Sequence, residues 1–213
     1  MQKRVFPPVS KPAVITVIDL LRHGDVEGGR KYRGHQDDPL SESGWQQLRD
    51  NTRHRQDWHQ IISSPLKRCA EFSRELADKY QLPLKIEQDF KEISFGLWEG
   101  KTAEELLAED EASIKKYWND PLNVTPPQGE ALFDFEKKII LAWNKMLNQY
   151  AGQHILLLSH AGVMRIILCH ILGMPLTELF KLDVALAKAS RIEIIHDEDK
   201  NYPTLIFHGA SFT

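Results

Sequence analysis

Hydrophobic residues gather in short continuous runs along this chain, and the clearest runs end at charged or polar residues. These runs cover residues 13–21, 61–62 and 155–158. Short apolar runs bounded by polar and turn residues are typical of strands that are buried on both faces of a sheet. Further strands are predicted at 84–86, 191–196 and 204–207.

Helical segments are expected between these strands. They are predicted at about 41–53, 64–80, from 102 onwards, 130–150 and 163–172. Ser64 is the expected N-cap of the second helix, with Pro65 at its first position. Thr102 and Glu105 have the spacing of a capping box, which predicts the start of the third helix.

This alternation predicts an α/β fold with three layers, in which helices cover both faces of a mainly parallel central sheet. The last two strands flank a polar turn at 197–201, so they are expected to add an antiparallel edge. We expect one domain over 1–213, with a small cap-like excursion at about 90–130, and a frayed leader at 1–12.

Composition narrows the class of partner. A hydrophobic content of 42% with 27% charged residues is ordinary for a soluble globular protein. The net charge of −3 argues against nucleic acid or an anionic membrane as partner, so positive potential must be local and suits a small anionic substrate. Cys69 and Cys169 have no paired spacing, which favours reduced thiols and a cytoplasmic protein. No segment resembles a membrane span.

Cations and histidines follow the ends of the predicted parallel strands. Arg22 and His23 follow the first strand, Arg68 lies just after the second, and His160 follows a later one. Ligands of open α/β sheets bind outside the carboxyl ends of the strands, so these four side chains are expected to converge. Two arginines match the paired oxygens of a phosphate, and free amides at the helix start near Arg68 are expected to add to that site.

Each histidine has an expected role. A neutral His23 is the candidate nucleophile, and its other ring nitrogen needs an acceptor, commonly a backbone carbonyl, to fix the tautomer. His160 is expected to donate to phosphoryl oxygens as charge shifts. An alcohol leaving group needs a proton; Glu92 is the candidate general acid and Glu99 is its rival, and residue chemistry alone leaves both open. We expect no metal and no cofactor, since no metal-ligand spacing is present.

These segments resemble the histidine phosphatase superfamily, in its phosphoglycerate mutase-like branch. Five blocks stand in the order of that family, at residues 20–24, 32–44, 63–69, 92–100 and 159–163. The resemblance implies a phosphoglycerate mutase-like fold and hydrolysis of phosphomonoesters through a phosphohistidine on His23. It selects Glu92 over Glu99 as the acid. It also implies substrate contacts, beside Arg22 and Arg68, from Gly24, Arg33, Gly34 and Ala161.

The amino-acid sequence of the block at 92–100 is similar to that of α-ribazole-5′-phosphate phosphatases of cobalamin biosynthesis and their broad-specificity relatives. Two positions depart from the family. Val26 stands where Thr or Ser is usual, and Gly29 where Asn is frequent, which removes a hydroxyl and an amide. Backbone amides at Gly28 and Gly29 are a possible replacement. Ala131 also replaces a frequent Ser.

Other functions stay open at this point. A cofactor-dependent phosphoglycerate mutase shares the nucleophile, but the stretch at 117–123 has few of the cations that such relatives carry. A regulatory protein that binds a phosphorylated ligand without turnover would suit the losses at Val26 and Gly29, but has no need of Glu92. Dephosphorylation of a phosphoprotein would need an open cleft.

The candidates to stack on an aromatic substrate are Tyr32, Trp45, Trp98 and Trp118. The partner is expected to be a small phosphorylated metabolite, and the chain a monomer or homodimer.

Overall fold

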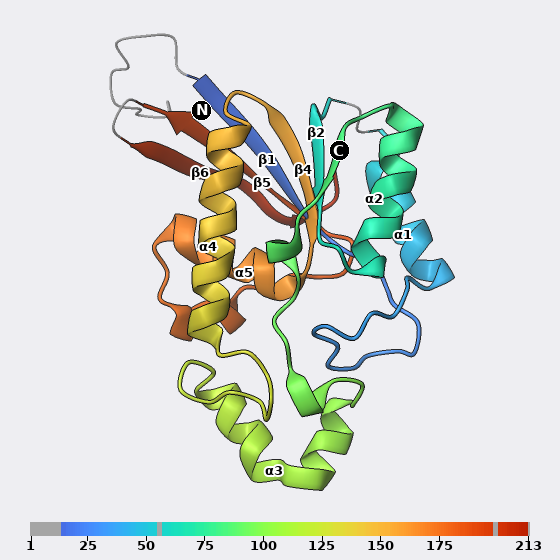
Figure 1. The fold of residues 1–213 in the computed structure, drawn as a ribbon, viewed down its shortest axis with the longest axis vertical. Helices are drawn as coiled ribbons and strands as arrows, with labels where there is room; N and C mark the ends of the chain where they lie inside the picture. The colour runs from blue at the N-terminus through green and yellow to red at the C-terminus, as the bar shows by residue number, and fades with distance from the viewer. Residues whose placement is uncertain (1–13, 55–56, 198–199, 213) are drawn as a thin grey trace.

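The central sheet has six strands. The computed structural model describes residues 14–54, 57–197 and 200–212, so the leader expected at 1–12 lies outside the described residues. The strands are β1 (Val14–Arg22), β2 (Gln60–Ser63), β3 (Leu84–Ile86), β4 (His154–Ser159), β5 (Ala189–His196) and β6 (Asn201–Ala210). Their order is β3-β2-β4-β1-β5-β6. The first four strands in this order are parallel, whereas β5 and β6 pair antiparallel at one edge (Figure 1), which confirms the predicted sheet.

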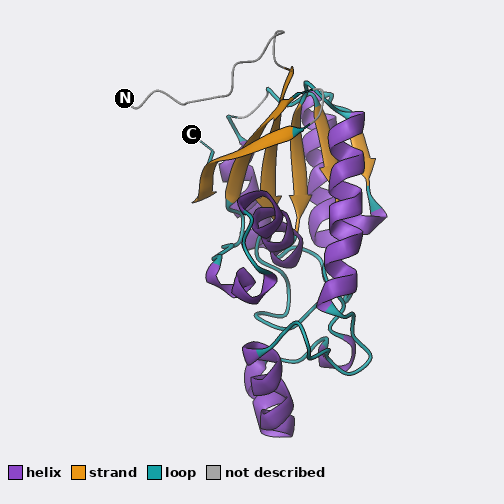
Figure 2. Ribbon diagram, turned by 90° about the vertical axis from the view of Figure 1, so that its left-hand side faces the viewer, coloured by secondary structure: helices purple, strands orange, loops and turns teal. Residues whose placement is uncertain are grey.

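Helices cover both faces of this sheet (Figures 1 and 2). The helices on the sheet are α1 (Glu42–Thr52), α2 (Lys67–Tyr80), α4 (Leu132–Gln149) and α5 (Ala161–Leu172), whereas α3 (Ala103–Asn119) lies away from it. Side chains alternate across β1, so Ile18 and Leu20 join the core beneath α4 and α5, while Leu21 joins the core beneath α1 and α2. In the part of the chain that the structure describes, no helix combines the length and apolar character needed to cross a membrane.

The register of the parallel strands brings their carboxyl ends together. Arg22 at the end of β1 lies opposite Ser159 at the end of β4, and Ser63 at the end of β2 lies opposite Leu158. The segments that leave these three strands therefore start side by side at one edge of the sheet. This is the arrangement that the sequence predicts for the cations and histidines.

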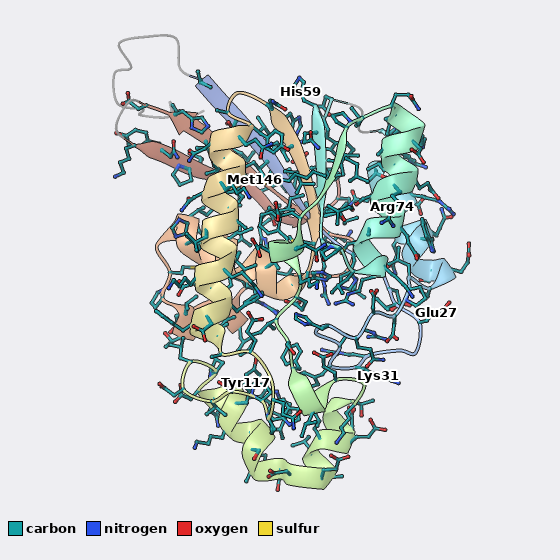
Figure 3. The ribbon with its side chains drawn as sticks, in the orientation of Figure 1. Glu27, Lys31, His59, Arg74, Tyr117 and Met146 are labelled. Carbon is teal, nitrogen blue, oxygen red and sulfur yellow. The ribbon has the colours of Figure 1, made fainter. Side chains whose placement is uncertain are left out.

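The excursion between β3 and α4 lies beyond that same edge. It contains η1 (Gln88–Phe90), η2 (Gly96–Trp98) and α3, and a small separate core joins Trp98, Leu106, Ile114 and Tyr117. The predicted capping box of Thr102 and Glu105 is present at the start of α3. Tyr117 lies towards the sheet from α3, whereas His59 marks the opposite end of the molecule (Figure 3).

The prediction that Ser64 is the N-cap of α2 is wrong. The helix begins at Lys67, its N-cap is Leu66 without a side-chain cap, and the Lys67 amide donates to Asp37 Oδ1 at 2.6 Å. Ser64 is drawn away from the helix because its hydroxyl lies 2.6 Å from Nε2 of His160 on the neighbouring strand end. The Lys67 amide is therefore occupied by a carboxylate and is not one of the free donors expected beside Arg68.

Candidate active site

His23 has the geometry of a nucleophile. Its Nδ1 lies 2.8 Å from the carbonyl oxygen of Gly24, an acceptor that fixes the proton on Nδ1 and leaves Nε2 with a free lone pair. Burial, followed by the charges of Arg68 and Arg22, holds the pKa of His23 well below its usual range, so the ring stays neutral at neutral pH. The backbone carbonyl expected as its partner is thus present.

His160 lies beside that nucleophile. The centroids of the two imidazole rings are 5.3 Å apart and the rings meet edge to face, so one anion can touch both. His160 is fully buried, and burial, followed by the charge of Arg68, holds its pKa well below the usual range. The convergence of the two histidines, predicted from strand ends, is confirmed in the geometry.

Two guanidinium groups border the histidines: that of Arg68 is fully buried and that of Arg22 is half-buried. Arg68 donates from Nε to His160 Nδ1 at 3.3 Å, from Nη1 to the Gln36 carbonyl at 2.9 Å and from Nη2 to the Gly34 carbonyl at 2.8 Å. Each terminal nitrogen carries a second hydrogen that these bonds do not use. Arg22 donates from Nη1 to the Val184 carbonyl at 2.6 Å, and its buried Nε has no partner among the described residues. Burial lowers the pKa of both groups.

Glu92 is anchored at the start of α5. Its Oε2 accepts from the Gly162 amide at 3.1 Å and its Oε1 from the Ile93 amide at 3.0 Å. Gly162 leaves the space that this carboxylate occupies, because a Cβ atom at this position would lie 2.2 Å from Glu92 Oε1. The carboxylate is among the charges that act on both Arg22 and Arg68, which places it close to the candidate anion site.

Glu99, the rival acid, has a different position. Its Oε1 accepts from the amides of His35 and Phe95 and from the Ser94 hydroxyl, and its Oε2 accepts from the Gln36 amide, at 2.8 to 3.2 Å. Four donors therefore hold this carboxylate between two loops. The geometry assigns Glu99 to loop structure and leaves Glu92 as the candidate acid.

The remaining predicted substrate contacts lie around the same centre. Gly24 supplies the carbonyl that holds His23, Gly34 supplies a carbonyl to Arg68, and Ala161 is the first residue of α5. Arg33 donates to Asp38 and to the carbonyls of Glu27 and Gly29. Because these contacts lie within its own loop, Arg33 organises the loop in this structure, and contact with a substrate stays a prediction.

The structure shows how Val26, one of the departures from the family pattern, and the candidate stacking residues are packed. Val26 is buried and bridges to Leu40, so apolar packing replaces the usual hydroxyl. Trp98 is buried in the small core of the excursion, and Trp45 packs against Phe72. Of the aromatic candidates, Trp118 is exposed and donates from Nε1 to the Tyr32 hydroxyl at 2.7 Å.

Sequence reasoning missed three residues of this site. Ser64 contacts His160, Asp37 accepts from the first amide of α2, and Arg165 donates from Nε to the Leu182 carbonyl at 3.0 Å while its charge acts on Arg22. Only Ser64 had a usable signal, since it directly follows a strand end that neighbours the strand carrying His160. Among the described residues, no group of three or more His, Cys, Asp or Glu side chains could hold a metal ion.

Several known proteins are similar to this chain in sequence or in structure. A bifunctional protein of Mycobacterium tuberculosis is 30% identical over 183 residues, which cover 84% of this chain and 50% of that protein. The chain thus spans about half the length of this relative. The adenosylcobalamin/alpha-ribazole phosphatase of Escherichia coli is 27% identical over 179 residues, covering 82% of this chain and 88% of the relative. The crystal structure of the alpha-ribazole phosphatase from Shigella flexneri matches with a TM-score of 0.79 at 25% identity, covering 92% of this chain and 98% of that one.

A protein-family model also matches most of the chain. The model described as histidine phosphatase superfamily, branch 1, matches residues 18–202. This range starts inside β1 and ends near the start of β6, so it takes in the whole of β2 to β5 and every strand end that carries a candidate residue. The chain belongs to branch 1 of the histidine phosphatase superfamily.

Proposed function

We propose that this chain hydrolyses phosphomonoesters through a phosphohistidine on His23. One observation carries the proposal: the Nδ1 bond to Gly24 leaves Nε2 of a neutral, buried imidazole free, beside the ring of His160. A neutral Nε2 can attack phosphorus, and the Gly24 carbonyl stabilises the Nδ1 proton as the ring gains positive charge. Membership of a phosphatase family supports this reading.

The reaction has two steps. In the first, Nε2 of His23 attacks phosphorus, the bond from phosphorus to the leaving oxygen breaks, and Glu92 gives that oxygen a proton. In the second, the Glu92 carboxylate takes a proton from water as the water oxygen attacks phosphorus, the N–P bond breaks, and phosphate leaves. Arg22, Arg68 and His160 hold the phosphoryl oxygens in both steps, which supplies the charge stabilisation that phosphoryl transfer needs.

The test uses p-nitrophenyl phosphate and trapping of a ³²P-labelled enzyme intermediate. We expect wild-type turnover, a trapped phosphoenzyme, and a loss of at least about a thousandfold in His23→Ala. His170→Ala removes an exposed imidazole from the last turn of α5 and is expected to keep parental activity. Wild-type activity at background would favour a regulatory binding protein, and full activity in His23→Ala would overturn the phosphohistidine.

For the substrate, we propose a small phosphorylated metabolite in the cytoplasm, with α-ribazole 5′-phosphate as the first candidate. Two relatives at 25–27% identity are alpha-ribazole phosphatases by name, which supports this candidate. A panel of phosphomonoesters that includes α-ribazole 5′-phosphate and 3-phosphoglycerate tests it by kcat/KM. A highest value for α-ribazole 5′-phosphate is expected, whereas an isomerised product from 3-phosphoglycerate without release of phosphate would identify a mutase instead.

A further inference from the structure

The Ser64 hydroxyl is placed against the inner edge of His160. Its Oγ lies 2.6 Å from Nε2 of His160 and accepts from the Leu66 amide at 3.3 Å. Ser64 is fully buried. The Nε2 atom of the ring therefore faces the buried Ser64. The Nδ1 atom faces Arg68, one of the two arginines of the candidate anion site.

The contacts decide which nitrogen carries the proton in this structure. Arg68 can only donate, so Nδ1 of His160 accepts its Nε hydrogen at 3.3 Å. A neutral ring with a lone pair on Nδ1 carries its proton on Nε2 and donates it to Ser64 Oγ. Burial, which lowers the pKa of His160, keeps the ring in this neutral form.

This arrangement conflicts with the role proposed for His160 during catalysis. A ring with its only proton on Nε2 has no N–H to offer at the Nδ1 edge, where the phosphoryl oxygens would lie. Two lone pairs facing one another would repel. His160 can donate to the anion only after its proton is on Nδ1, and Nε2 then needs a donor.

We propose that Ser64 is a positioning residue that lets His160 change tautomer when a phosphoryl group binds, an inference that rests on the proposed function. Without the anion, Ser64 Oγ accepts from Nε2–H. With the anion bound, Ser64 rotates its hydroxyl and donates to Nε2, while Nδ1–H donates to a phosphoryl oxygen. The Nε hydrogen of Arg68 then leaves Nδ1 and also donates to the phosphoryl group. The ring loses one proton at Nε2 and gains one at Nδ1 by exchange with water, so its charge is unchanged and Ser64 keeps its own proton.

A hydroxyl suits this position because it can both donate and accept through rotation. The neighbouring thiol of Cys69 is not a substitute. Its Sγ lies 3.9 Å from Nδ1 and 3.8 Å from Nε2, so it favours neither nitrogen, and it donates to the Ser159 carbonyl. Ser64 is thus the neighbour that can serve Nε2 in both states.

Kinetics of matched variants give the first test. Ser64→Ala leaves Nε2 of the Nδ1–H tautomer without a donor, and we expect kcat to fall about tenfold to a hundredfold with a smaller change in KM. Ser64→Thr keeps a hydroxyl and is expected to recover most of that loss. Ser73→Ala removes another fully buried hydroxyl, one that has no partner among the described residues, and is expected to match the parent. Equal losses in Ser64→Ala and Ser64→Thr, or parental kcat in Ser64→Ala, would overturn the proposal.

Nitrogen NMR tests the tautomer directly and needs no turnover. With ¹⁵N-labelled histidine, and the His160 signals assigned by their loss in His160→Gln, we expect the proton on Nε2 in the free protein and on Nδ1 with inorganic phosphate bound. A proton that stays on Nε2 with phosphate bound would refute the switch even if the enzyme hydrolyses phosphomonoesters. Failure of the proposed function has a separate signature, which is absence of turnover and phosphoenzyme in the wild type.

Discussion

At the scale of single residues, the candidate acid depends on a glycine. The Gly162 amide donates to Glu92 at 3.1 Å, and the missing side chain leaves the space that the carboxylate occupies. The orientation of the carboxylate is therefore set by α5, the same helix that starts directly after His160. One helix start thus positions two of the three proposed catalytic groups.

Gly162→Ala should impair proton donation without unfolding the protein. A Cβ atom would lie 2.2 Å from Glu92 Oε1, and the flexible carboxylate can move away at little cost in stability. We expect kcat to fall about tenfold to a hundredfold for alkyl phosphates, whose leaving groups need the proton, and much less for p-nitrophenyl phosphate. Glu92→Gln should show the same dependence on leaving group. Equal losses on both substrate types would argue against this role of Gly162.

At the scale of elements, the site depends on two loops that a single carboxylate joins. Glu99 accepts from the amides of His35 and Gln36 in one loop and from Ser94 and Phe95 in the other. The first loop supplies the Gly34 and Gln36 carbonyls that hold Arg68. The second follows Glu92 directly. Glu99 therefore links the support of the anion clamp to that of the acid.

Glu99→Gln should weaken both supports. The amide that replaces the carboxylate turns one acceptor into a donor, so at least one of four bonds is lost in a partly buried place. We expect about 1–3 kcal/mol less stability against urea and a KM raised severalfold or more. Glu109→Gln makes the same change at an exposed carboxylate of α3 paired with Lys101, which contributes little. Similar behaviour of the two variants would mean that Glu99 does not link the loops.

At the scale of the whole molecule, the sequence predicts the strands and the edge of the sheet at which the site lies, because local patterns and strand order determine both. Apolar runs locate the strands, and parallel strands share one carboxyl edge, which is enough to bring Arg22, His23 and His160 together. The role of Ser64 was mistaken because a local N-cap pattern competes with a contact to a residue 96 positions away. The sequence gives no sign of the contact that Asp37 makes with α2, since a loop partner leaves no periodic signal. For the same reason, it presents Glu99 as a rival acid and does not reveal that this carboxylate links two loops.

The two ends of the sheet hold their buried titratable groups in opposite ways. Near the site, His23 and His160 are buried neutral. Towards the other end, Asp19 is fully buried and ionised; burial alone would raise its pKa, but hydrogen bonds from His154, Arg191 and Trp58 lower it below its ordinary value. Asp19 therefore stabilises the fold at every pH above its ordinary value of 3.8 and loses that contribution only as the pH falls below it.

His23 and His160 should control the pH dependence of stability at a higher pH than Asp19 does. Both have folded-state pKa values well below the ordinary 6.5, so below that pH the unfolded chain binds protons that the folded protein does not. Stability therefore falls as the pH drops from about 6.5 towards 4.5, by up to about 1.4 kcal/mol per pH unit for each ring. The free energy of unfolding, measured with urea across this pH range, gives a slope against pH. Relative to the wild type, that slope should correspond to about one proton fewer in His23→Gln, and likewise in His160→Gln. An unchanged slope in both site variants would mean that the rings take up protons in the folded state, and a neutral nucleophile at low pH would then be excluded.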